Sequence, residues 1–446
     1  MSKLDELIKK LCPDGVEYKN LSEVAEYVRG LTYGKTDELN TEWEKGIPVL
    51  RANNITLGIN KLNFDEVKYV KRSVKIKDNQ FLAKDDILIC AGSGSKEHVG
   101  KVAFINENLP YAFGGFMAVI RAKKPISLLP RYIYHNLTGK RFRRHIGFTI
   151  DSATINNLNA RIVGSFKIPV PPLEVQREIV KILDNFTELT AELTAELTAR
   201  KKQYEYYRNR LLTFDTASHI KKVKLGDVAK VTKLAGFEFT KYVTYAEKGH
   251  IIALRGLNVK NGNLDLCDVK YIDGSDLSKL ERSKLHVGDM LFTYVGTIGQ
   301  VALIDKEDTY YLAPNVALIR VDKNVLLPEY MRFYFQSSLF WDTQIKRLLQ
   351  SSSMKNIPME KIRKFELLVP PIDVQRRLVH VLDNFDKVCN DLHIGLPAEI
   401  EARKKQYEFY RDSLLTFLEK GESILTDRQT DRQTDRQTDR TEVRPD

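Results

Sequence analysis

Few residues in this sequence have types and spacing suited to catalysis, and each such stretch fails on its context. Residues 30–36 (GLTYGKT) resemble a phosphate-binding loop, but three residues separate the glycines where that loop has four. Residues 13–19 (PDGVEYK) resemble a metal-dependent nuclease motif, but their carboxylates lie too close in sequence to sit on two successive strands. Residues 92–96 (GSGSK) fit a turn that follows a strand.

The histidines and cysteines form no catalytic or metal-binding pattern either. The eight histidines are scattered without a His-Glu-x-x-His zinc motif, and the sequence has no Asn-Pro-Pro-Tyr or Asp-Pro-Pro-Tyr stretch, which is typical of base-methylating enzymes. Cys12, Cys90, Cys267 and Cys389 lie far apart, which argues against a disulfide framework or a Cys-x-x-Cys zinc site and predicts a reducing cytoplasm. We therefore expect a binding or targeting component without a metal site, rather than an enzyme.

The composition predicts a folded chain with a polyanionic partner. The 446 residues include 70 Lys and Arg against 59 Asp and Glu, which gives a formal net charge of +11. Hydrophobic residues make up 43% and charged residues 29%, as in globular proteins. The charge fits nucleic acid, a membrane surface or no specific partner. No apolar run approaches the roughly 18 residues of a spanning helix, and we expect neither such a helix nor a signal peptide.

The dominant feature of the sequence is a tandem duplication. Residues 170–186 (VPPLEVQREIVKILDNF) return as residues 369–385 (VPPIDVQRRLVHVLDNF). Residues 199–214 (ARKKQYEYYRNRLLTF) return as residues 402–417 (ARKKQYEFYRDSLLTF). Weaker echoes relate the segments that precede these copies. The chain is therefore two copies of one module, in which a variable block is followed by a nearly identical block.

The variable blocks predict a mixed α/β fold. Asn261-Gly262 predicts a hairpin turn, and Pro130 and Pro328, each after two leucines, predict the first turn of a helix. Short apolar runs bounded by turn residues predict buried strands at residues 85–92, 116–122, 289–296 and 316–321.

The nearly identical blocks predict long helices that begin after a Pro-Pro pair. Apolar residues recur at spacings of three and four from Leu173 to Phe214, and the second copy repeats this coiled-coil-like stripe until Gly395 and Pro397 interrupt it. The two helices pack on each other, antiparallel, as in an ordinary bundle, or each packs on another subunit. The predicted seam residues are Ile182, Phe186, Leu193, Tyr204, Tyr207, Val381, Phe385, Tyr407 and Tyr410.

Two tracts of low complexity stand out. Residues 187–198 (TELTAELTAELT) repeat Thr-Ala-Glu-Leu inside the first predicted helix, and one more unit would make the two helices equal in length. One unit lengthens a helix by about 6 Å. The duplication around the tract favours a spacer over a helical stutter without consequence. Residues 426–440 (TDRQTDRQTDRQTDR) contain no apolar residue and predict a disordered tail. A repeated ACAG tetranucleotide would encode this tract, so we hypothesise a phase-variable gene, which sequencing its codons would test.

The combination of blocks resembles the DNA-specificity subunit of type I restriction–modification systems. The resemblance rests on the Val-Pro-Pro-x-x-Val-Gln-Arg blocks, the Ala-Arg-Lys-Lys-Gln-Tyr-Glu blocks and residues 12–18 (CPDGVEY), and it spans about residues 8–418. It implies two target-recognition domains, each of which reads one half of a split, asymmetric DNA target. The expected domains are residues 1–169 (first target-recognition domain), 170–217 (central helical spacer), 218–368 (second target-recognition domain), 369–420 (distal helical region) and 421–446 (disordered tail).

The resemblance also implies the partners of this chain. In the family, the paired helices separate the two domains and dock two methyltransferase subunits, here through the seam residues, and a motor and nuclease subunit completes the restriction complex. The family subunit has no active site, so S-adenosylmethionine, ATP and Mg²⁺ belong to the partner subunits, and we expect no cofactor in this chain. Double-stranded DNA and these subunits are then the partners, without a membrane, in the cytoplasm.

Residue type and loop position predict which side chains contact DNA. Lys and Arg suit phosphates, and Arg, Lys, Asn and Gln suit base edges. For each candidate the alternative is a solvated surface charge. For the matched pairs Arg51/Arg255 and Asn54/Asn258 it is a fold-stabilising hydrogen bond, since base readers should differ between the halves. The candidates are Arg51, Asn54, Lys96, Lys140, Arg141, Arg143, Arg144, Arg255, Asn258, Tyr294, Thr297, Lys346 and Arg347.

Two other functions stay open at this point. One is the specificity subunit of a related system in which modification and cleavage share a single partner chain. The other is a helical scaffold whose variable blocks bind protein. Duplex binding that weakens steeply with salt would speak against the scaffold.

Overall fold

The computed structural model divides the chain into two compact units. Unit 1 comprises Met1–Glu192 with Glu401–Asp446, and unit 2 comprises Leu193–Ile400. The structure describes residues 3–39, 46–123, 128–150, 157–214, 220–234, 239, 241–350, 356–391 and 394–417. The repetitive segment 426–440, for which we predict disorder, lies outside these ranges. Each unit contains one variable block, and the predicted domain boundaries stay predictions.

Unit 1 contains two main sheets and a short strand pair. In the first sheet β4 and β9 run parallel, with Leu50 opposite Phe113. The first sheet has the order β3 (Glu38–Leu39), β5 (Lys68–Val70), β4 (Ile47–Leu50), β9 (Leu109–Phe113), β6 (Phe81–Leu82). The second, antiparallel sheet has the order β2 (Ala25–Arg29), β10 (Met117–Ala122), β7 (Ile87–Cys90), β8 (Val102–Phe104). The short pair is β1 (Tyr18–Asn20) with β11 (Lys167–Pro169).

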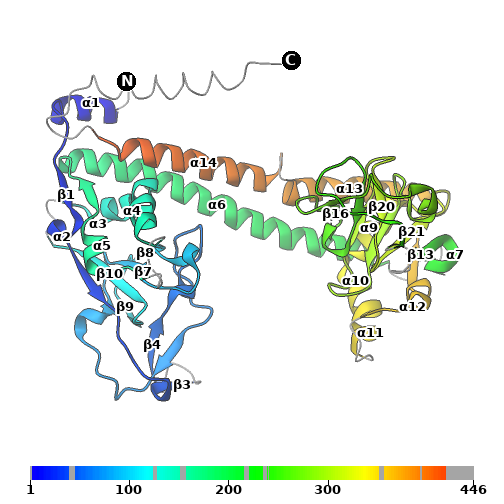
Figure 1. Cartoon of the computed structure of the whole chain (residues 1–446), viewed down its shortest axis with the longest axis horizontal. Helices are drawn as coiled ribbons and strands as arrows, with labels where there is room; N and C mark the ends of the chain where they lie inside the picture. Colours follow the sequence, from blue (N-terminus) through cyan, green and yellow to red (C-terminus); the bar gives the residue numbers. More distant parts are fainter. Residues whose placement is uncertain are drawn as a thin grey trace. The chain divides into compact units, whose positions relative to one another are not determined.

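The helices of unit 1 cover one face of the second sheet. Strand β7 is buried on both faces, because Ile87 and Ile89 pack with the helices and Leu88 and Cys90 pack towards the first sheet. The main core lies between strands β7 and β10 on one side and α3 (Pro130–Thr138) and the start of α6 (Leu173–Leu212) on the other (Figure 1). The helices are α1 (Lys3–Leu11), α2 (Leu21–Val24), α3 (Pro130–Thr138), α4 (Lys140–Ile150), α5 (Ala160–Gly164) and the 3₁₀ turns η1 (Lys35–Asp37), η3 (Ala52–Asn54), η4 (Asp78–Gln80) and η5 (Lys96–His98).

Unit 2 repeats the antiparallel sheet, the short strand pair and the three central strands of the first sheet. Strands β14 and β20 run parallel, with Leu254 opposite Leu312. The sheets have the orders β17 (Lys270–Tyr271), β14 (Ile252–Leu254), β20 (Tyr310–Leu312); β13 (Ala229–Lys233), β21 (Val316–Val321), β18 (Met290–Thr293), β19 (Val301–Leu303); β12 (Lys221–Lys224) with β22 (Glu366–Val369); and β15 (Val259–Lys260) with β16 (Asn263–Leu264).

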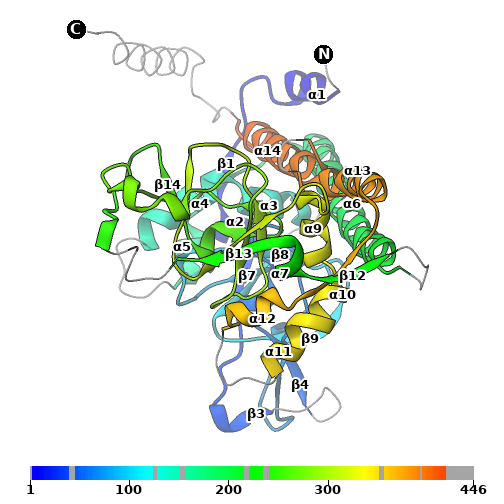
Figure 2. The same ribbon diagram turned by 90° about the vertical axis from the view of Figure 1, so that its right-hand side faces the viewer.

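The helices of unit 2 include a π-helical turn. Figure 2 shows α12 (Met359–Arg363) and α7 (Leu225–Val228) beside β13, which follows α7 directly, and these elements are in contact. The helices are α7 (Leu225–Val228), α9 (Pro328–Phe335), α10 (Ser338–Phe340), α11 (Lys346–Gln350), α12 (Met359–Arg363), α13 (Ile372–Asn390), the π-helix η9 (Trp341–Ile345) and the 3₁₀ turns η6 (Gly256–Asn258), η7 (Leu277–Lys279) and η8 (Glu281–Ser283).

The local predictions from sequence are confirmed in both units. The four predicted strands correspond to β7, β10, β18 and β21. Asn261 and Gly262 have φ angles of 49° and 88°, as a type I′ hairpin between β15 and β16 requires. Pro130 and Pro328 occupy the first turns of α3 and α9, where the missing N–H costs no hydrogen bond.

A buried glutamine explains why the Pro-Pro blocks are nearly identical. The Gln176 side chain accepts a hydrogen bond from the Leu129 N–H at 2.9 Å and donates to the Pro171 carbonyl at 2.7 Å. Gln375 makes the same two contacts in unit 2, with the Leu327 N–H at 2.8 Å and the Pro370 carbonyl at 2.8 Å. Both side chains are buried, so each amide satisfies backbone groups that would otherwise lose hydrogen bonds.

Each of the two long helices begins in one unit and ends in the other. Helix α6 (Leu173–Leu212) begins in unit 1 and ends in unit 2, whereas α14 (Leu396–Leu414) begins in unit 2 and ends in unit 1. The expected interruption at Gly395 and Pro397 corresponds to the break between α13 and α14. Each unit therefore packs its own Leu-Asp-Asn-Phe segment against the Gln-Tyr-Glu segment of the other copy.

In unit 1 this packing is aromatic and polar. Phe186 stacks on Tyr410, with ring centroids 5.3 Å apart. His135 is fully buried and bridges the Asp184 carboxylate at 2.9 Å and the Tyr407 hydroxyl at 3.2 Å. Burial lowers the pKa of His135, so the neutral imidazole donates to Asp184 and accepts from Tyr407. This bridge fastens the end of α14 to α3 and α6 within unit 1.

In unit 2 the packed stripe differs from the predicted seam by one residue on α13. Tyr204 and Tyr207 stack on Phe385 at centroid distances of 6.4 and 5.7 Å, as the seam requires. The buried apolar positions on α13 are Leu382 and Cys389, however, and Val381 is 40% exposed. The i+4 and i+7 steps from Leu378 pass through Leu382 and Phe385, which leaves Val381 at the margin of the stripe. Ile182 and Leu193 of α6 are half-buried.

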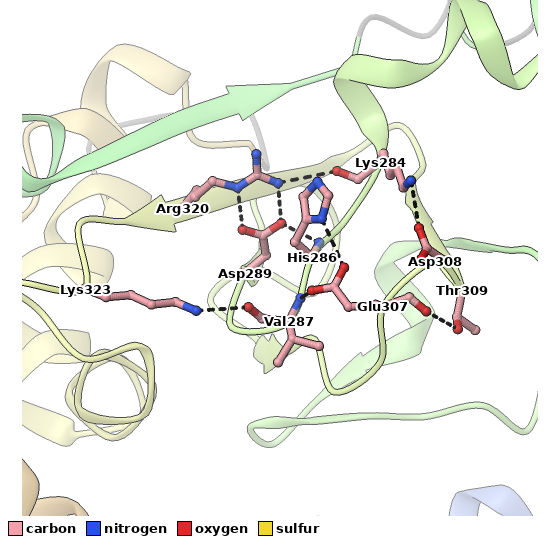
Figure 3. A network of polar contacts seen from close by, with 9 residues as sticks. All are labelled: Lys284, His286, Val287, Asp289, Glu307, Asp308, Thr309, Arg320 and Lys323. Atoms are coloured by element: carbon pink, nitrogen blue, oxygen red, sulfur yellow. Dashed lines mark hydrogen bonds and ion pairs between the residues drawn. The ribbon is translucent and has the colours of Figure 1, made fainter.

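A bidentate ion pair links the two inner strands of each antiparallel sheet. In unit 2 the Arg320 guanidinium on β21 donates to both carboxylate oxygens of Asp289, at 2.7 and 2.6 Å, and Asp289 also accepts from the His286 N–H (Figure 3). Asp86 and Arg121 make the same pair in unit 1. Around Asp289, the Lys284–Asp308 and His286–Glu307 pairs lie at the surface (Figure 3).

We predict that Asp289→Asn lowers the free energy of unfolding of unit 2 by about 2 kcal/mol, because a buried carboxylate loses its charge-assisted hydrogen bonds. Asp308→Asn is the matched control, since its carboxylate is 76% exposed and asparagine tolerates the φ of 52° at this position. Differential scanning calorimetry of the two variants measures the difference. An equal shift in melting temperature for both would contradict the prediction.

Candidate nucleic-acid interface

Strand topology brings three loops of unit 1 to one edge. Because β4 and β9 are parallel, Arg51 and the segment 114–116 leave the sheet at the same end. Strand β7 ends opposite the first residue of β10, with Cys90 paired to Met117. Residues 92–94, which follow β7, therefore lie at the same edge as Arg51 and the segment 114–116. The Phe116 carbonyl accepts hydrogen bonds from the Ala91 and Gly92 N–H groups at 2.8 and 2.9 Å, which fixes these loops to each other.

The three loops line a hollow of about 1350 Å³, which we call the unit 1 hollow. Its lining offers donors and acceptors of the kind that contact phosphates and base edges, together with the aromatic rings of Tyr33 and Phe116. Phe116 is 69% exposed. The lining includes Arg51, Asn53, Asn63, Asp65, Ser93, His98, Lys101, Phe116 and Asn157.

The floor of the hollow is held by two buried polar side chains. Asn54 accepts a hydrogen bond from the Arg51 N–H at 2.8 Å and donates to the Asn63 carbonyl at 3.2 Å. The Lys101 ammonium donates to the carbonyls of Ala52 and Ile55 at 2.7 and 2.6 Å. Burial lowers the pKa of Lys101. The structure thus favours a fold-stabilising role for Asn54, and it reveals Lys101, which sequence reasoning missed because a lone lysine carries no local signal of burial.

Unit 2 builds the corresponding edge with other residues. Arg255 follows β14, Asn315 follows β20, and Tyr294 and Thr297 follow β18. Asn258 is buried and accepts from the Arg255 N–H at 3.0 Å, as Asn54 does in unit 1. Burial raises the pKa of the half-buried Tyr294, whereas Thr297 is exposed.

The remaining predicted DNA contacts lie on helices and turns of the two units. Lys96 is exposed at the start of η5. On α4, Lys140, Arg143 and Arg144 are exposed, whereas the half-buried Arg141 lies over the Tyr18 ring at 5.0 Å. In unit 2, Lys346 pairs with Asp342 at 3.6 Å, and Arg347 is exposed. Among the described residues of α4, none lines the unit 1 hollow. Which of these side chains contacts DNA stays a prediction.

Within the described ranges of the chain, no group of three or more His, Cys, Asp and Glu side chains is placed to hold a metal ion. No helix within the same ranges combines the length and apolar character needed to cross a bilayer.

Comparison with known proteins identifies similar sequences along almost the whole chain. A family model described as the type I restriction modification DNA specificity domain matches residues 13–200 and again residues 218–402. A Haemophilus influenzae protein named as a type I restriction enzyme specificity subunit is 31% identical over 417 residues, which cover 90% of this chain and 96% of the relative. The EcoKI specificity subunit of Escherichia coli K12 is 28% identical over 393 residues, covering 82% and 81%.

Two solved structures share the fold. A chain from a study of complex assembly and conformational transition in a type I restriction–modification system has a TM-score of 0.58 at 15% identity and covers 91% of this chain and 98% of its own. The specificity (S) subunit of a type I system from M. genitalium has a TM-score of 0.50 at 13% identity, covering 90% and 96%. At these identities the likeness concerns the fold.

We predict that Lys101→Met destabilises unit 1 by about 2–3 kcal/mol, because the Ala52 and Ile55 carbonyls then lose a buried charged donor. Hydrogen exchange should speed up at residues 52–55. Lys96→Met, at an exposed lysine of the neighbouring loop, is the control and should leave exchange there unchanged. Unchanged exchange and melting temperature in Lys101→Met would show that this lysine does not support the hollow.

Proposed function

Because this chain belongs to the type I restriction–modification DNA specificity family, we propose that its two units read the two halves of a split, asymmetric DNA target. The chain is a specificity subunit, which recognises DNA sequence and is not itself an enzyme. The proposal concerns how this recognition is distributed over the fold.

The observation that carries the proposal is that both units have the same strand edge but present different side chains there. In each unit, two parallel strands and a strand of the antiparallel sheet end at the same edge. The loops that follow these strands are therefore presented in the same way in both units. The side chains at this edge differ, with Phe116 in unit 1 at the position of Asn315 in unit 2. One chain with two similar but unlike surfaces suits a bipartite target of unlike half-sites.

We further propose that the helices bind the methyltransferase subunits. The duplicated Gln-Tyr-Glu segments carry aromatic rings that packing within each unit leaves uncovered: Tyr206 is 57% exposed and Phe409 is 68% exposed. Exposed aromatic residues are typical of protein interfaces. Antiparallel packing of α6 with the second-copy helices, with Val381 at its margin, would present both segments to equivalent partners. The motor and nuclease subunit would complete the complex, and S-adenosylmethionine, ATP and Mg²⁺ would bind to partner subunits.

The Thr-Ala-Glu-Leu tract supports a role for α6 in setting the distance between half-sites. The tract is helical throughout, within the 40-residue helix α6. We predict that one added unit lengthens the unread spacer of the target by one to two base pairs, since about 6 Å of helix compares with roughly 3.4 Å per base step. The measurement is a genome-wide map of methylated adenines after co-expression with the methyltransferase subunit.

The control for this experiment replaces one Thr-Ala-Glu-Leu unit with four other helix-forming residues. This variant should keep the spacer unchanged, because the helix length is the same. A change of bases within a half-site, rather than of the spacer, would contradict the proposed role of α6. The absence of any split motif in the parent complex would overturn the proposed function itself.

A second prediction concerns the basic cluster on α4. In the methyltransferase complex, Arg143→Ala/Arg144→Ala should weaken duplex binding for all sequences alike and reduce the salt slope by about 2, as expected for two lost phosphate contacts. The double variant Lys71→Ala/Arg72→Ala, at exposed positions elsewhere in unit 1, is the charge-matched control. Equal salt slopes for the two double variants would exclude α4 as a phosphate-contacting helix.

A further inference from the structure

Two matched arginines are engaged differently in the two units. In unit 2 the Arg255 guanidinium donates to the Asp268 carboxylate at 2.8 Å and to the Asp268 carbonyl at 2.9 Å. In unit 1 the position of Asp268 is occupied by Glu66, two residues before the lysine that opens β5, as Asp268 precedes β17. Glu66 accepts from the Asn53 amide at 3.0 Å instead.

Two side-chain differences accompany this contrast, Glu66 against Asp268 and Asn53 against Leu257. Asn53 of unit 1 corresponds to Leu257 of unit 2, which has no donor and leaves Asp268 to the arginine. Nε is buried without a partner in both Arg51 and Arg255. The two arginines differ in their terminal nitrogens: Asp268 engages Nη2 of Arg255, whereas within the described part of unit 1 no side chain forms a hydrogen bond with the Arg51 guanidinium. An arginine in this state, at the wall of a hollow, keeps its donors available for a ligand.

A second feature distinguishes the same edge of unit 1. Phe116 stands after two glycines, and its backbone is fixed by the two hydrogen bonds to its carbonyl. A Cβ at Gly115 would lie 3.2 Å from the Thr32 hydroxyl and 3.3 Å from the Leu31 carbonyl, so this turn packs closely against the neighbouring chain. The Phe116 ring is nevertheless 69% exposed, on the rim that Arg51 also lines. In unit 2 the position is Asn315, with a φ of 70°.

We propose that Arg51 and Phe116 together read bases of the half-site that unit 1 recognises. Arg51 donates two hydrogen bonds to O6 and N7 of a guanine in the major groove, and Phe116 packs on the methyl group of a neighbouring thymine. Guanidinium groups match the guanine edge, and exposed apolar rings match the thymine methyl group. This inference rests on the proposed function, in that it assigns one half-site to unit 1.

The engaged state of Arg255 explains how duplicated arginines can serve unlike half-sites. Arg51 and Arg255 are identical in sequence, but the groups around them pair differently. Asp268 engages the Arg255 guanidinium, whereas Glu66 accepts a hydrogen bond from Asn53. The two halves therefore diverge in what they read through residues beside the arginines.

The test measures base preference position by position. The complex of this chain with its methyltransferase subunits is offered a library of duplexes randomised at each base of both half-sites, and methylation is read by sequencing. Arg51→Ala should reduce the preference for guanine at one position of one half-site by about 10–100-fold and leave the other half-site unchanged. Phe116→Asn should reduce the preference for thymine at an adjacent position.

Two further variants separate this reading from a structural effect. Asn53→Leu reproduces the unit 2 arrangement, frees Glu66 to capture Arg51, and should reduce the preference at the same guanine as Arg51→Ala. Lys61→Ala, an exposed cation close in sequence to residues of the hollow, is the control and should preserve all base preferences. Melting temperatures equal to that of the parent chain confirm that each variant is folded.

Each outcome supports or overturns the inference. Loss of one guanine preference in both Arg51→Ala and Asn53→Leu supports it. A uniform loss of methylation across all sequences would make Arg51 a phosphate contact and overturn the inference, while the parent complex would still display a split motif and the proposed function would stand. A parent complex without a split motif would overturn the proposed function instead.

Discussion

The parallel pairing of β4 with β9, repeated by β14 with β20, is the constraint on which both candidate interfaces depend. Parallel strands point the same way, so the residues that follow them meet at one edge although they lie far apart in the chain. The antiparallel pairing of the neighbouring sheet then adds the loop after β7 or β18 to that edge. Arg51, Phe116 and the glycine–serine loop share one hollow for this reason.

The two copies share this backbone arrangement, but the side chains at matching positions differ. Lys101, which holds the turn at residues 52–55, is replaced in unit 2 by Gln300, whose side chain accepts from the Asn261 N–H at 3.0 Å and holds a hairpin. The same pairing of strands is thus supported by different polar groups and exposes different side chains. Different side chains on the same strand arrangement would let one chain present two different recognition surfaces.

The nearly identical blocks have a structural explanation of their own. Gln176 and Gln375 satisfy buried backbone groups where a helix follows a Pro-Pro pair, and a residue without an amide would leave those groups unpaired. The exchange of helix ends adds a second requirement, because each Gln-Tyr-Glu segment packs in the unit of the other copy. Residues under these requirements are the ones that the two copies share.

The sequence by itself determined the duplication, the α/β class, the strands at β7, β10, β18 and β21, the helix starts and the hairpin at Asn261, because periodicity, turn chemistry and proline geometry act over a few residues. The sequence also identified the family, because the two kinds of duplicated block and residues 12–18 occur together in it. Other features depended on contacts between distant segments. Leu382 rather than Val381 is buried because the neighbouring helix decides which face of α13 is covered. Asn54 and Asn258 are buried because the turns close over them. Arg51 and Arg255, identical in sequence, differ because side chains elsewhere in the chain, Asn53 with Glu66 and Asp268, compete for hydrogen bonds, and only the tertiary structure brings those partners within reach.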